Sequence, residues 1–356
     1  MSIEVKSGDL LRQEGIDAIV NTVNCVGVMG KGIALQFKQK WPENFEAYRL
    51  ACSRGEVKLG SMFVYDSGGL VKPNFIVNFP TKGHWKERSR LTNIEAGLHD
   101  LVERIRQLQI RSIAIPPLGC GNGGLDWAVV KPLIEDVLTS ELPEVTVYLF
   151  EPGSTPRSKD METRTKKPRM TRARAALVKL LEVYKELGYG LSKIEVQKLA
   201  YFLQCSGEDM GLTFLKHEFG PYSDQLRHAL QRMEGHYIRG LGDGVSAAEI
   251  EPMPQAIGEA SEYLRAAGNS DLDGLVERVG SLIEGFQSPY GMELLATVHW
   301  ISSHDPSAKT PEDVLEIVQD WNERKRRLMT LDHVRVAWQR LKEDGWLEGA
   351  YRTANA

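Results

Sequence analysis

The first 153 residues alternate short strand-like runs with amphipathic helical segments, and this alternation restricts the fold more than any other feature of the chain. Each strand candidate is a run of β-branched or aromatic residues bounded by turn residues. The strand candidates span residues 3–6, 17–23, 62–66, 74–79, 112–116 and 145–150. The helical candidates span residues 28–40, 44–54, 92–108 and 127–138. The pattern predicts an α/β fold of three layers with a mixed, largely parallel central sheet, in which ligands bind at the carboxyl ends of strands.

From residue 175 onward, apolar residues recur at helical spacing. Leu177, Leu180, Leu181 and Tyr184 follow the i, i+3, i+4, i+7 pattern of one helix face. Ser192 precedes a second helical run and has a glutamate three residues later, which is typical of a capping box. Further helices are expected over residues 224–234, 258–266, 272–285, 289–302, 311–326 and 331–344. The second half is therefore predicted to be a mainly α-helical domain.

Charge divides the 356-residue chain into three parts. Residues 1–153 contain 17 Lys and Arg against 18 Asp and Glu, a net charge of −1. Residues 154–174 contain 8 against 2, a net of +6, and residues 175–356 contain 19 against 28, a net of −9. We therefore expect two domains, over residues 1–153 and 175–356, joined by a basic linker. The linker is either a simple tether or a segment weakly attracted to nucleic-acid phosphate.

Several classes of protein are disfavoured by composition. The chain has no run of about 18 consecutive apolar residues, so no membrane span or membrane partner is expected. Its start lacks the basic-then-apolar pattern of a signal peptide, which favours a cytoplasmic location. The four cysteines are scattered and the histidines lack HExxH or Cys/His spacing, so we expect neither a metal site nor a cofactor.

Three loops that follow predicted strands contain chemically useful residues. The first has the sequence NTVNCVGVMGKG over residues 21–32, and the second has PLGCGNGGLDW over residues 117–127. Glycines let the backbone approach a ligand closely, and the start of a helix offers free N–H groups to phosphate. The third loop, FPTKGHW over residues 79–85, places a lysine and a histidine just after a strand. One glycine-rich loop alone is only a tight turn, but two such loops together with Gly8-Asp9-Leu10 indicate a phosphate-containing ligand.

In this order of motifs the N-terminal half resembles a macrodomain, the fold that binds ADP-ribose. The lysine of FPTKGHW and the GLDW ending resemble those of DarG antitoxins and their TARG-like relatives. Members of these families remove ADP-ribose from DNA bases or from carboxyl side chains. DarG pairs with the toxin DarT, which attaches ADP-ribose to thymine in single-stranded DNA.

The resemblance implies a role for each loop. Asp9 would accept a hydrogen bond from the adenine amino group, beside the Leu10 backbone, and Asn24 would contact the distal ribose. The first loop would surround the diphosphate from one side through Val28, Met29, Gly30 and Lys31. The second loop would close over the diphosphate from the other side through Leu118, Gly119, Cys120, Gly121, Asn122, Gly123 and Gly124.

Lys82 is the expected catalytic residue. Cleavage of the bond between ribose C1 and a thymine nitrogen builds positive charge on the ribose. A neutral Lys82 amine would attack C1, which requires desolvation or a cationic neighbour such as Lys31; a Lys82 ammonium would instead protonate the departing base. The resemblance places Asp126 as an acidic partner that resolves the adduct. Alternatively, Asp126 is only the N-cap of the following helix.

The loop after Lys82 is the candidate DNA contact. Trp85 would stack on an unpaired base, unless it is a core tryptophan. His84 and Lys86 lie on either side of it, and Lys86 with Arg88 and Arg90 would meet DNA phosphates, unless this is a solvated loop.

The acidic half resembles the SocA-like, or Panacea, antitoxin domain through SKIEVQKLAYFLQ at residues 192–204 and KHEFGPYS at residues 216–223. The resemblance implies neutralisation of a toxin by direct binding. An acidic surface would occupy a basic DNA-binding groove of such a toxin. The candidate contacts are the acidic residues Glu208, Asp209, Asp243, Glu249 and Glu251. A competing interpretation treats residues 331–347 as the helix of a DNA-binding winged helix, and a third treats them as a core helix.

Together these observations predict a DarT/DarG-type antitoxin that removes ADP-ribose from thymidine in single-stranded DNA and also binds the DarT-like toxin. One alternative is a hydrolase of ADP-ribosylated Glu or Asp in proteins. Another is a non-catalytic ADP-ribose reader with a DNA-binding C-terminal domain.

Overall fold

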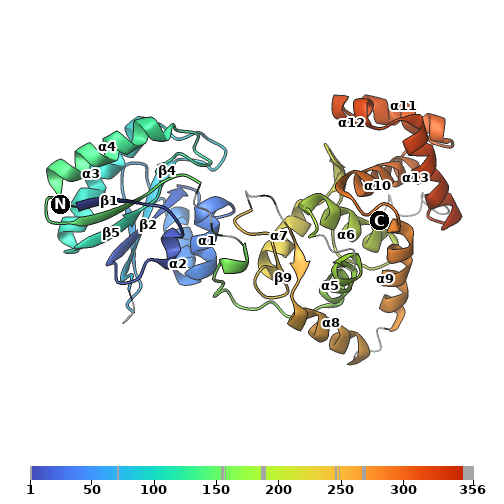
Figure 1. Ribbon diagram of the computed structural model, residues 1–356, viewed down its shortest axis with the longest axis horizontal. Helices are drawn as coiled ribbons and strands as arrows, with labels where there is room; N and C mark the ends of the chain where they lie inside the picture. Colours follow the sequence, from blue (N-terminus) through green and yellow to red (C-terminus); the bar gives the residue numbers. More distant parts are fainter. Residues whose placement is uncertain are drawn as a thin grey trace. The chain divides into compact units, whose positions relative to one another are not determined.

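The chain folds into two compact units (Figure 1). The computed structural model describes residues 2–69, 72–153, 156, 158–185, 190–244, 247, 249–266 and 270–347. The N-terminal unit comprises Met1–Lys166 together with Gly242–Ser246, and the C-terminal unit comprises Lys167–Leu241 and Ala247–Ala356.

A six-stranded mixed sheet forms the centre of the N-terminal unit. Its strands are β1 (Ser2–Lys6), β2 (Ala18–Asn24), β3 (Phe63–Asp66), β4 (Phe75–Lys82), β5 (Ser112–Ile115) and β6 (Thr146–Phe150). Their order is β1-β6-β5-β2-β4-β3. All neighbours are parallel except the antiparallel pair of β3 and β4. The six predicted strands and the largely parallel sheet are therefore confirmed.

Helices cover both faces of this sheet (Figure 1). They are α1 (Gly32–Lys40), α2 (Pro42–Ser53), α3 (Leu91–Gln107) and α4 (Trp127–Glu141). Successive residues of a strand point to opposite faces. On β5, Ile113 and Ile115 pack in the core beneath α3 and α4, whereas Ala114 packs with Phe37 of α1 on the other face. The predicted three layers are confirmed.

The first helix begins later than its periodicity suggests. We expect it from residue 28, but α1 starts at Gly32. The Asn24 side chain bonds to the backbone of Val26 and Val28, which holds these residues in a loop instead of a helical turn. The helix ends at Lys40, before Trp41-Pro42, as expected, because Pro42 opens α2.

The basic segment after residue 153 packs on the N-terminal unit over part of its length. The Arg164 backbone N–H donates to the Gln39 carbonyl at 2.8 Å. The Lys40 ammonium lies 3.2 Å from the Glu162 carboxylate, and Arg12 bonds to the Asp160 carbonyl. The unit accordingly continues to Lys166, past the boundary expected at residue 153.

The C-terminal unit is mainly helical. Its helices are α5 (Arg172–Lys185), α6 (Lys193–Cys205), α7 (Asp224–Met233), α8 (Pro254–Ala266), α9 (Ser270–Ile283), α10 (Pro289–His304), α11 (Pro311–Trp321), α12 (Glu323–Leu328) and α13 (Leu331–Glu343). Two small antiparallel pairs accompany them: β7 (Leu215–His217) with β8 (Gly220–Tyr222), and β9 (Ile238–Arg239) with β10 (Glu251–Pro252). The helix predicted over 311–326 is divided, because Asn322 caps a new helix by accepting from the Lys325 N–H at 2.8 Å.

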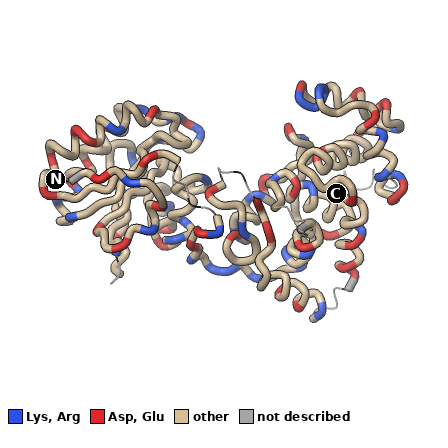
Figure 2. The backbone as a smooth tube through the Cα atoms, in the orientation of Figure 1, with Lys and Arg blue, Asp and Glu red and all other residues tan. Residues whose placement is uncertain are grey.

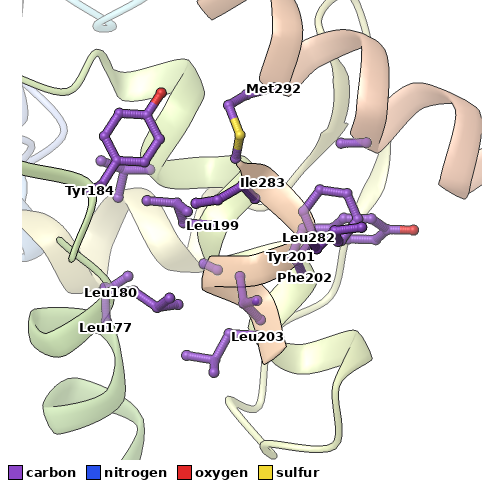
Figure 3. Close-up of a cluster of buried hydrophobic side chains, with 14 of the residues drawn as sticks. Leu177, Leu180, Tyr184, Leu199, Tyr201, Phe202, Leu203, Leu282, Ile283 and Met292 are labelled. Carbon is purple, nitrogen blue, oxygen red and sulfur yellow. The ribbon is translucent and has the colours of Figure 1, made fainter. Parts of the chain in front are cut away.

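Helix α6 is the centre of this unit's core. Its residues 195–203 are all buried, and its capping box at Ser192 and Glu195 forms as expected. Figure 3 shows Leu199, Tyr201, Phe202 and Leu203 of α6 among side chains from α5, α9 and α10. The predicted apolar face of α5 is buried here as well.

The two motifs that resemble the Panacea domain meet inside this core. The Lys198 ammonium, 1% exposed, donates to the Pro221 carbonyl at 2.6 Å. Beside it, the Gln197 side chain exchanges two hydrogen bonds of 2.9 Å with the Ser223 backbone. Burial, assisted by the positive charge of Lys325, lowers the pKa of Lys198 to about 7. The buried lysine therefore joins the helix of one motif to the Gly-Pro turn of the other.

Charged residues of both signs lie along the helices of the C-terminal unit (Figure 2). The expected partner contacts at Glu208 and Asp243 are wrong, because both residues are buried. Glu208 accepts instead from Arg172 at 2.7 Å within the unit. Asp209, Glu249 and Glu251 are exposed. Helix α13 buries Val334, Ala337 and Leu341 in the core, as the core-helix interpretation expects. In the part of the chain that the structure describes, no helix has the length and apolar character needed to span a membrane.

Candidate active site

Three neighbouring parallel strands end at the same edge of the N-terminal sheet. Strand β2 pairs with both β4 and β5. Asn24 at the end of β2 is opposite Lys82 at the end of β4, and the N–H of Cys25 donates to the Gly83 carbonyl at 3.0 Å. The loop after β5 contains the second glycine-rich sequence. The sheet topology therefore brings together the three loops selected from the sequence.

The Asn24 side chain shapes the first loop. Its Oδ1 accepts from the N–H groups of Val26 and Val28, at 3.0 and 3.3 Å, and its Nδ2 donates to the Val28 carbonyl at 2.6 Å. The buried Tyr48 hydroxyl donates to the Asn24 carbonyl at 2.6 Å. The Met29 side chain anchors the loop because it is buried, with only 1% of its surface exposed. The expected contact between Asn24 and ribose stays a prediction.

The second loop is closed by contacts that only glycine allows. A Cβ on Gly123 would overlap the Gly119 carbonyl oxygen and the Ser89 hydroxyl. The Leu125 N–H donates to the Gly119 carbonyl and the Ser89 N–H to the Gly123 carbonyl, both at 3.0 Å. Gly119 has a φ of +71°, which favours glycine. The turn leaves Gly121, Asn122 and Gly124 exposed.

The two glycine-rich loops approach each other at the start of α1. A Cβ on Gly32 would lie 3.1 Å from Asn122 Nδ2. The Gly32 N–H donates to the backbone carbonyl of Asp243 at 2.8 Å. Lys31 precedes this position and is exposed. The N-terminus of α1, which favours anions, therefore lies beside the second loop.

Lys82 lies against the second loop. Its Nζ donates to the Asn122 carbonyl at 2.9 Å, and its side chain is half-buried. Burial lowers the pKa of Lys82, and the negative charge of Glu87 opposes this shift. A lowered pKa increases the fraction of neutral amine, the form required of a nucleophile.

The two aspartates selected from the sequence both cap helical turns. Asp126 Oδ1 accepts from the Ala128 N–H at 2.9 Å at the start of α4. Asp9 Oδ1 accepts from the Leu11 N–H at 2.9 Å and caps the 3-10 turn Leu10–Arg12. These bonds give both carboxylates a local structural role. Their expected roles in adduct resolution and adenine binding stay predictions.

The loop after Lys82 presents an aromatic surface. Trp85 is 49% exposed, so it is not a core tryptophan. The His84 and Trp85 ring centroids are 5.2 Å apart, and the Lys86 ammonium lies 5.0 Å from the Trp85 centroid. Arg88 and Arg90 are also exposed. This loop therefore combines a flat apolar ring with nearby positive charge.

Three residues of this region were not found from the sequence. Tyr48 supports the first loop, Ser89 bonds to the second loop, and Glu87 influences the pKa of Lys82. The only signal for Glu87 in the sequence is that it lies five residues after Lys82. No sequence signal points to Tyr48. Among the residues that the structure describes, no group of three or more His, Cys, Asp or Glu is arranged to hold a metal ion.

Known proteins resemble this chain over one or both units. The family model described as Macro domain matches residues 20–134. A DNA ADP-ribosyl glycohydrolase of Thermus aquaticus is 47% identical over 340 residues, which covers 96% of this chain and 93% of the relative. This alignment therefore includes the helical unit as well as the N-terminal one.

Two other matches are confined to part of the chain. A DNA ADP-ribosyl transferase-DNA ADP-ribosyl glycohydrolase fusion protein of Thermosipho africanus is 34% identical over 164 residues, or 42% of each chain. The solved macrodomain of Mycobacterium tuberculosis DarG is 54% identical and covers 43% of this chain and 100% of its own, with a TM-score of 0.41.

Proposed function

This chain belongs to the family of DNA ADP-ribosyl glycohydrolases, and from this premise we propose that it removes ADP-ribose from thymidine in single-stranded DNA with Lys82 as the catalytic residue. The observation that carries the proposal is the position of Lys82. Its half-buried amine lies at the end of β4, bonded to Asn122 of the second glycine-rich loop. A ligand cradled between the two loops would therefore have its terminal sugar within reach of this amine.

The proposed chemistry uses Lys82 as a nucleophile. The neutral amine attacks ribose C1, so a C1–Nζ bond forms and the bond between C1 and the thymine nitrogen breaks. The departing base takes up a proton, and water then releases ADP-ribose and restores the amine. Burial favours this route because it lowers the pKa of Lys82. Reduction with borohydride during turnover would trap the open-chain adduct on Lys82; no adduct on that residue would favour the acid role of its ammonium instead.

The DNA strand is proposed to bind beside this amine. Trp85 offers an exposed ring for an unpaired base, with His84 and Lys86 next to it. Lys86, Arg88 and Arg90 supply positive charge for backbone phosphates. Trp85 is only three residues after Lys82, so a base stacked on it would be close to the bond that is cleaved.

A release assay tests the proposed activity. An oligonucleotide with ADP-ribosylated thymidine is incubated with the wild type, Lys82→Ala and Lys58→Ala, an exposed lysine after α2. We expect the wild type and the Lys58 variant to release ADP-ribose, and Lys82→Ala to lose at least a hundredfold in rate. Equal release by all three would refute the assignment of Lys82. If the wild type binds ADP-ribose but releases none from the oligonucleotide, the alternative of a non-catalytic ADP-ribose reader would be supported.

A parallel assay tests the substrate class. Proteins ADP-ribosylated on Glu or Asp are offered to the same variants under the same conditions. We expect a higher kcat/KM on the DNA substrate, because the exposed Trp85 and its basic neighbours suit an unpaired strand. A higher kcat/KM on the protein substrate would establish the alternative hydrolase.

We further propose that the C-terminal unit binds and neutralises a DNA ADP-ribosyltransferase. Two observations support this: the relative in which a transferase and a glycohydrolase are fused, and the net charge of −9 over residues 175–356. An acidic surface suits the basic groove of an enzyme that binds DNA. Full-length Lys82→Ala should still inhibit the cognate transferase, with an affinity that falls as salt rises. Failure to inhibit, with the fold intact, would exclude neutralisation by binding.

A further inference from the structure

One face of helix α2 bonds to both strands whose ends carry the candidate site. Asn44 and Tyr48 are one helical turn apart on this face, and both are 0% exposed. Asn78 of β4 donates through Nδ2 to Asn44 Oδ1 at 2.7 Å, and Asn44 Nδ2 donates to Asn78 Oδ1 at 3.4 Å. The Tyr48 hydroxyl bonds instead to Asn24 at the end of β2. The helix therefore joins β2 and β4 through two buried polar side chains.

The Tyr48 hydroxyl reaches both the backbone and the side chain of Asn24. It donates to the Asn24 carbonyl at 2.6 Å and lies 3.2 Å from Asn24 Oδ1. A hydroxyl has a single proton, so the shorter bond takes most of it and the side-chain oxygen shares the rest. Burial raises the pKa of Tyr48, and the hydroxyl therefore stays a donor at neutral pH.

These contacts fix the orientation of the Asn24 amide. Its Oδ1 faces three donors, namely the N–H groups of Val26 and Val28 and the Tyr48 hydroxyl. A side-chain amide has two N–H donors, and within the described part of the chain the Val28 carbonyl is the one acceptor of Nδ2, at 2.6 Å. Because both ends of the amide are held, the second N–H has a set direction.

We propose that Tyr48 is a positioning residue, whose hydroxyl holds the Asn24 amide so that its second N–H donates to a hydroxyl of the ribose that Lys82 attacks. This inference rests on the proposed function. Asn24 and Lys82 are partners in the register of β2 and β4, so a sugar bonded to the amide is held beside the amine. The direction of the amide then sets how C1 approaches the amine, and the rate of attack depends steeply on that approach.

Tyr48→Phe removes the hydroxyl and keeps the ring, which packs with Val23 and Met29. Tyr237→Phe is the matched control in the C-terminal unit. Tyr237 is 2% exposed, and its hydroxyl also donates to a backbone carbonyl at 2.6 Å, that of Pro168. Each substitution leaves one carbonyl without its donor, so both should lower the melting temperature of the protein to a similar extent.

The test is the separate measurement of kcat and KM on the ADP-ribosylated oligonucleotide. Tyr48→Phe should lower kcat about tenfold, because the sugar is held less well for attack. Its KM should stay near the wild-type value, since the bonds from Asn24 to Val26 and Val28 remain and keep the shape of the first loop. Tyr237→Phe should keep the kcat and KM of the wild type.

A double-mutant cycle shows whether Tyr48 acts through Asn24. Asn24→Ala removes the amide that the hydroxyl is proposed to hold, and should itself lower kcat. Adding Tyr48→Phe to Asn24→Ala should then change kcat by less than about twofold, because the two residues act as one unit. A role of Tyr48 in stability alone would leave the two effects on kcat independent of each other.

Three results would overturn the inference. They are a wild-type kcat in Tyr48→Phe, an equal loss of kcat in Tyr48→Phe and Tyr237→Phe, and a full tenfold effect of Tyr48→Phe in the Asn24→Ala background. Failure of the proposed function looks different, because Lys82→Ala would then match the wild type or the wild type would release no ADP-ribose. An inactive Lys82→Ala beside a normal Tyr48→Phe enzyme would exclude the role of Tyr48 alone.

Discussion

The Lys82 ammonium donates to the backbone carbonyl of Asn122 at 2.9 Å, which connects the end of β4 to the glycine-rich loop that follows β5. The two residues are 40 positions apart in sequence. Their contact means that the shape of the second loop and the direction of the Lys82 amine depend on each other. Changes to either should therefore affect both ligand binding and catalysis.

Gly123→Ala should weaken ADP-ribose binding at least tenfold. The added Cβ would overlap the Gly119 carbonyl and the Ser89 hydroxyl, so the second loop must open. A tenfold loss corresponds to about 1.4 kcal/mol of binding free energy. Isothermal titration calorimetry with ADP-ribose measures this change in affinity. Gly258→Ala, at an exposed position on α8 outside the ligand loops, is the matched control, since a Cβ there meets nothing within 4 Å. Equal affinity of both variants would contradict the proposed role of this loop.

Trp85→Ala should reduce DNA affinity but leave ADP-ribose affinity unchanged. The ring is 49% exposed, so its removal should change the free energy of unfolding by only about 0.5 kcal/mol. Loss of one stacked base costs about 1–3 kcal/mol, which predicts a rise in KM for the oligonucleotide of roughly tenfold or more. Trp85→Phe should keep most of the affinity. An unchanged KM in the alanine variant would exclude stacking on this ring.

Glu293→Gln should destabilise the C-terminal unit strongly. The Glu293 carboxylate is 1% exposed and accepts from Lys325 at 2.5 Å and from Arg324 at 2.7 and 2.8 Å. Without it, the fully buried Lys325 ammonium loses its counter-charge, at a cost of about 3–5 kcal/mol. Urea unfolding followed by circular dichroism measures the change. Glu312→Gln, which breaks an exposed pair with Arg335, should have little effect.

The buried Lys198 should make the C-terminal unit more stable as pH rises above 7. Its pKa is about 7 in the folded chain, well below the ordinary value for lysine. Between these two values the unfolded chain binds a proton that the folded chain does not. Stability therefore rises with pH in this window by up to about 1.4 kcal/mol per pH unit.

Lys198→Met removes this titration and should flatten the dependence. The pH dependence of stability is measured by amide exchange within α6 of the full chain, from pH 7 to pH 9. The exchange rates are corrected for the intrinsic rate at each pH. Parallel slopes in the variant and the wild type would show that Lys198 is not the group responsible.

The sequence was most informative where one physical signal dominates. The β-branched strands of the N-terminal sheet and the long amphipathic helices were predicted because burial alone sets their periodicity. The start of α1 was missed because side-chain bonds from Asn24 compete with the helical pattern. The pairs β7–β8 and β9–β10 were missed because strands of two or three residues are too short to show alternation.

In the candidate site, too, some residues were predicted from the sequence and others were visible only in the folded structure. Lys82 and the two glycine-rich loops were selected because each follows a strand, and parallel strands bring their ends to one edge. Glu87 was not selected, since its position depends on a turn that only the folded backbone defines. The bond between Lys198 and Pro221 was likewise hidden, because it joins residues 23 positions apart through the core.

The first amide of α1 already has an acceptor, because the Gly32 N–H donates to the carbonyl of Asp243 at 2.8 Å. A phosphate oxygen can accept from that amide in place of the carbonyl only in molecules in which the backbone segment at Asp243 has withdrawn. Any affinity that relies on this amide is then the intrinsic affinity multiplied by the population of the withdrawn form. A change that draws the segment away would tighten binding without altering one ligand contact.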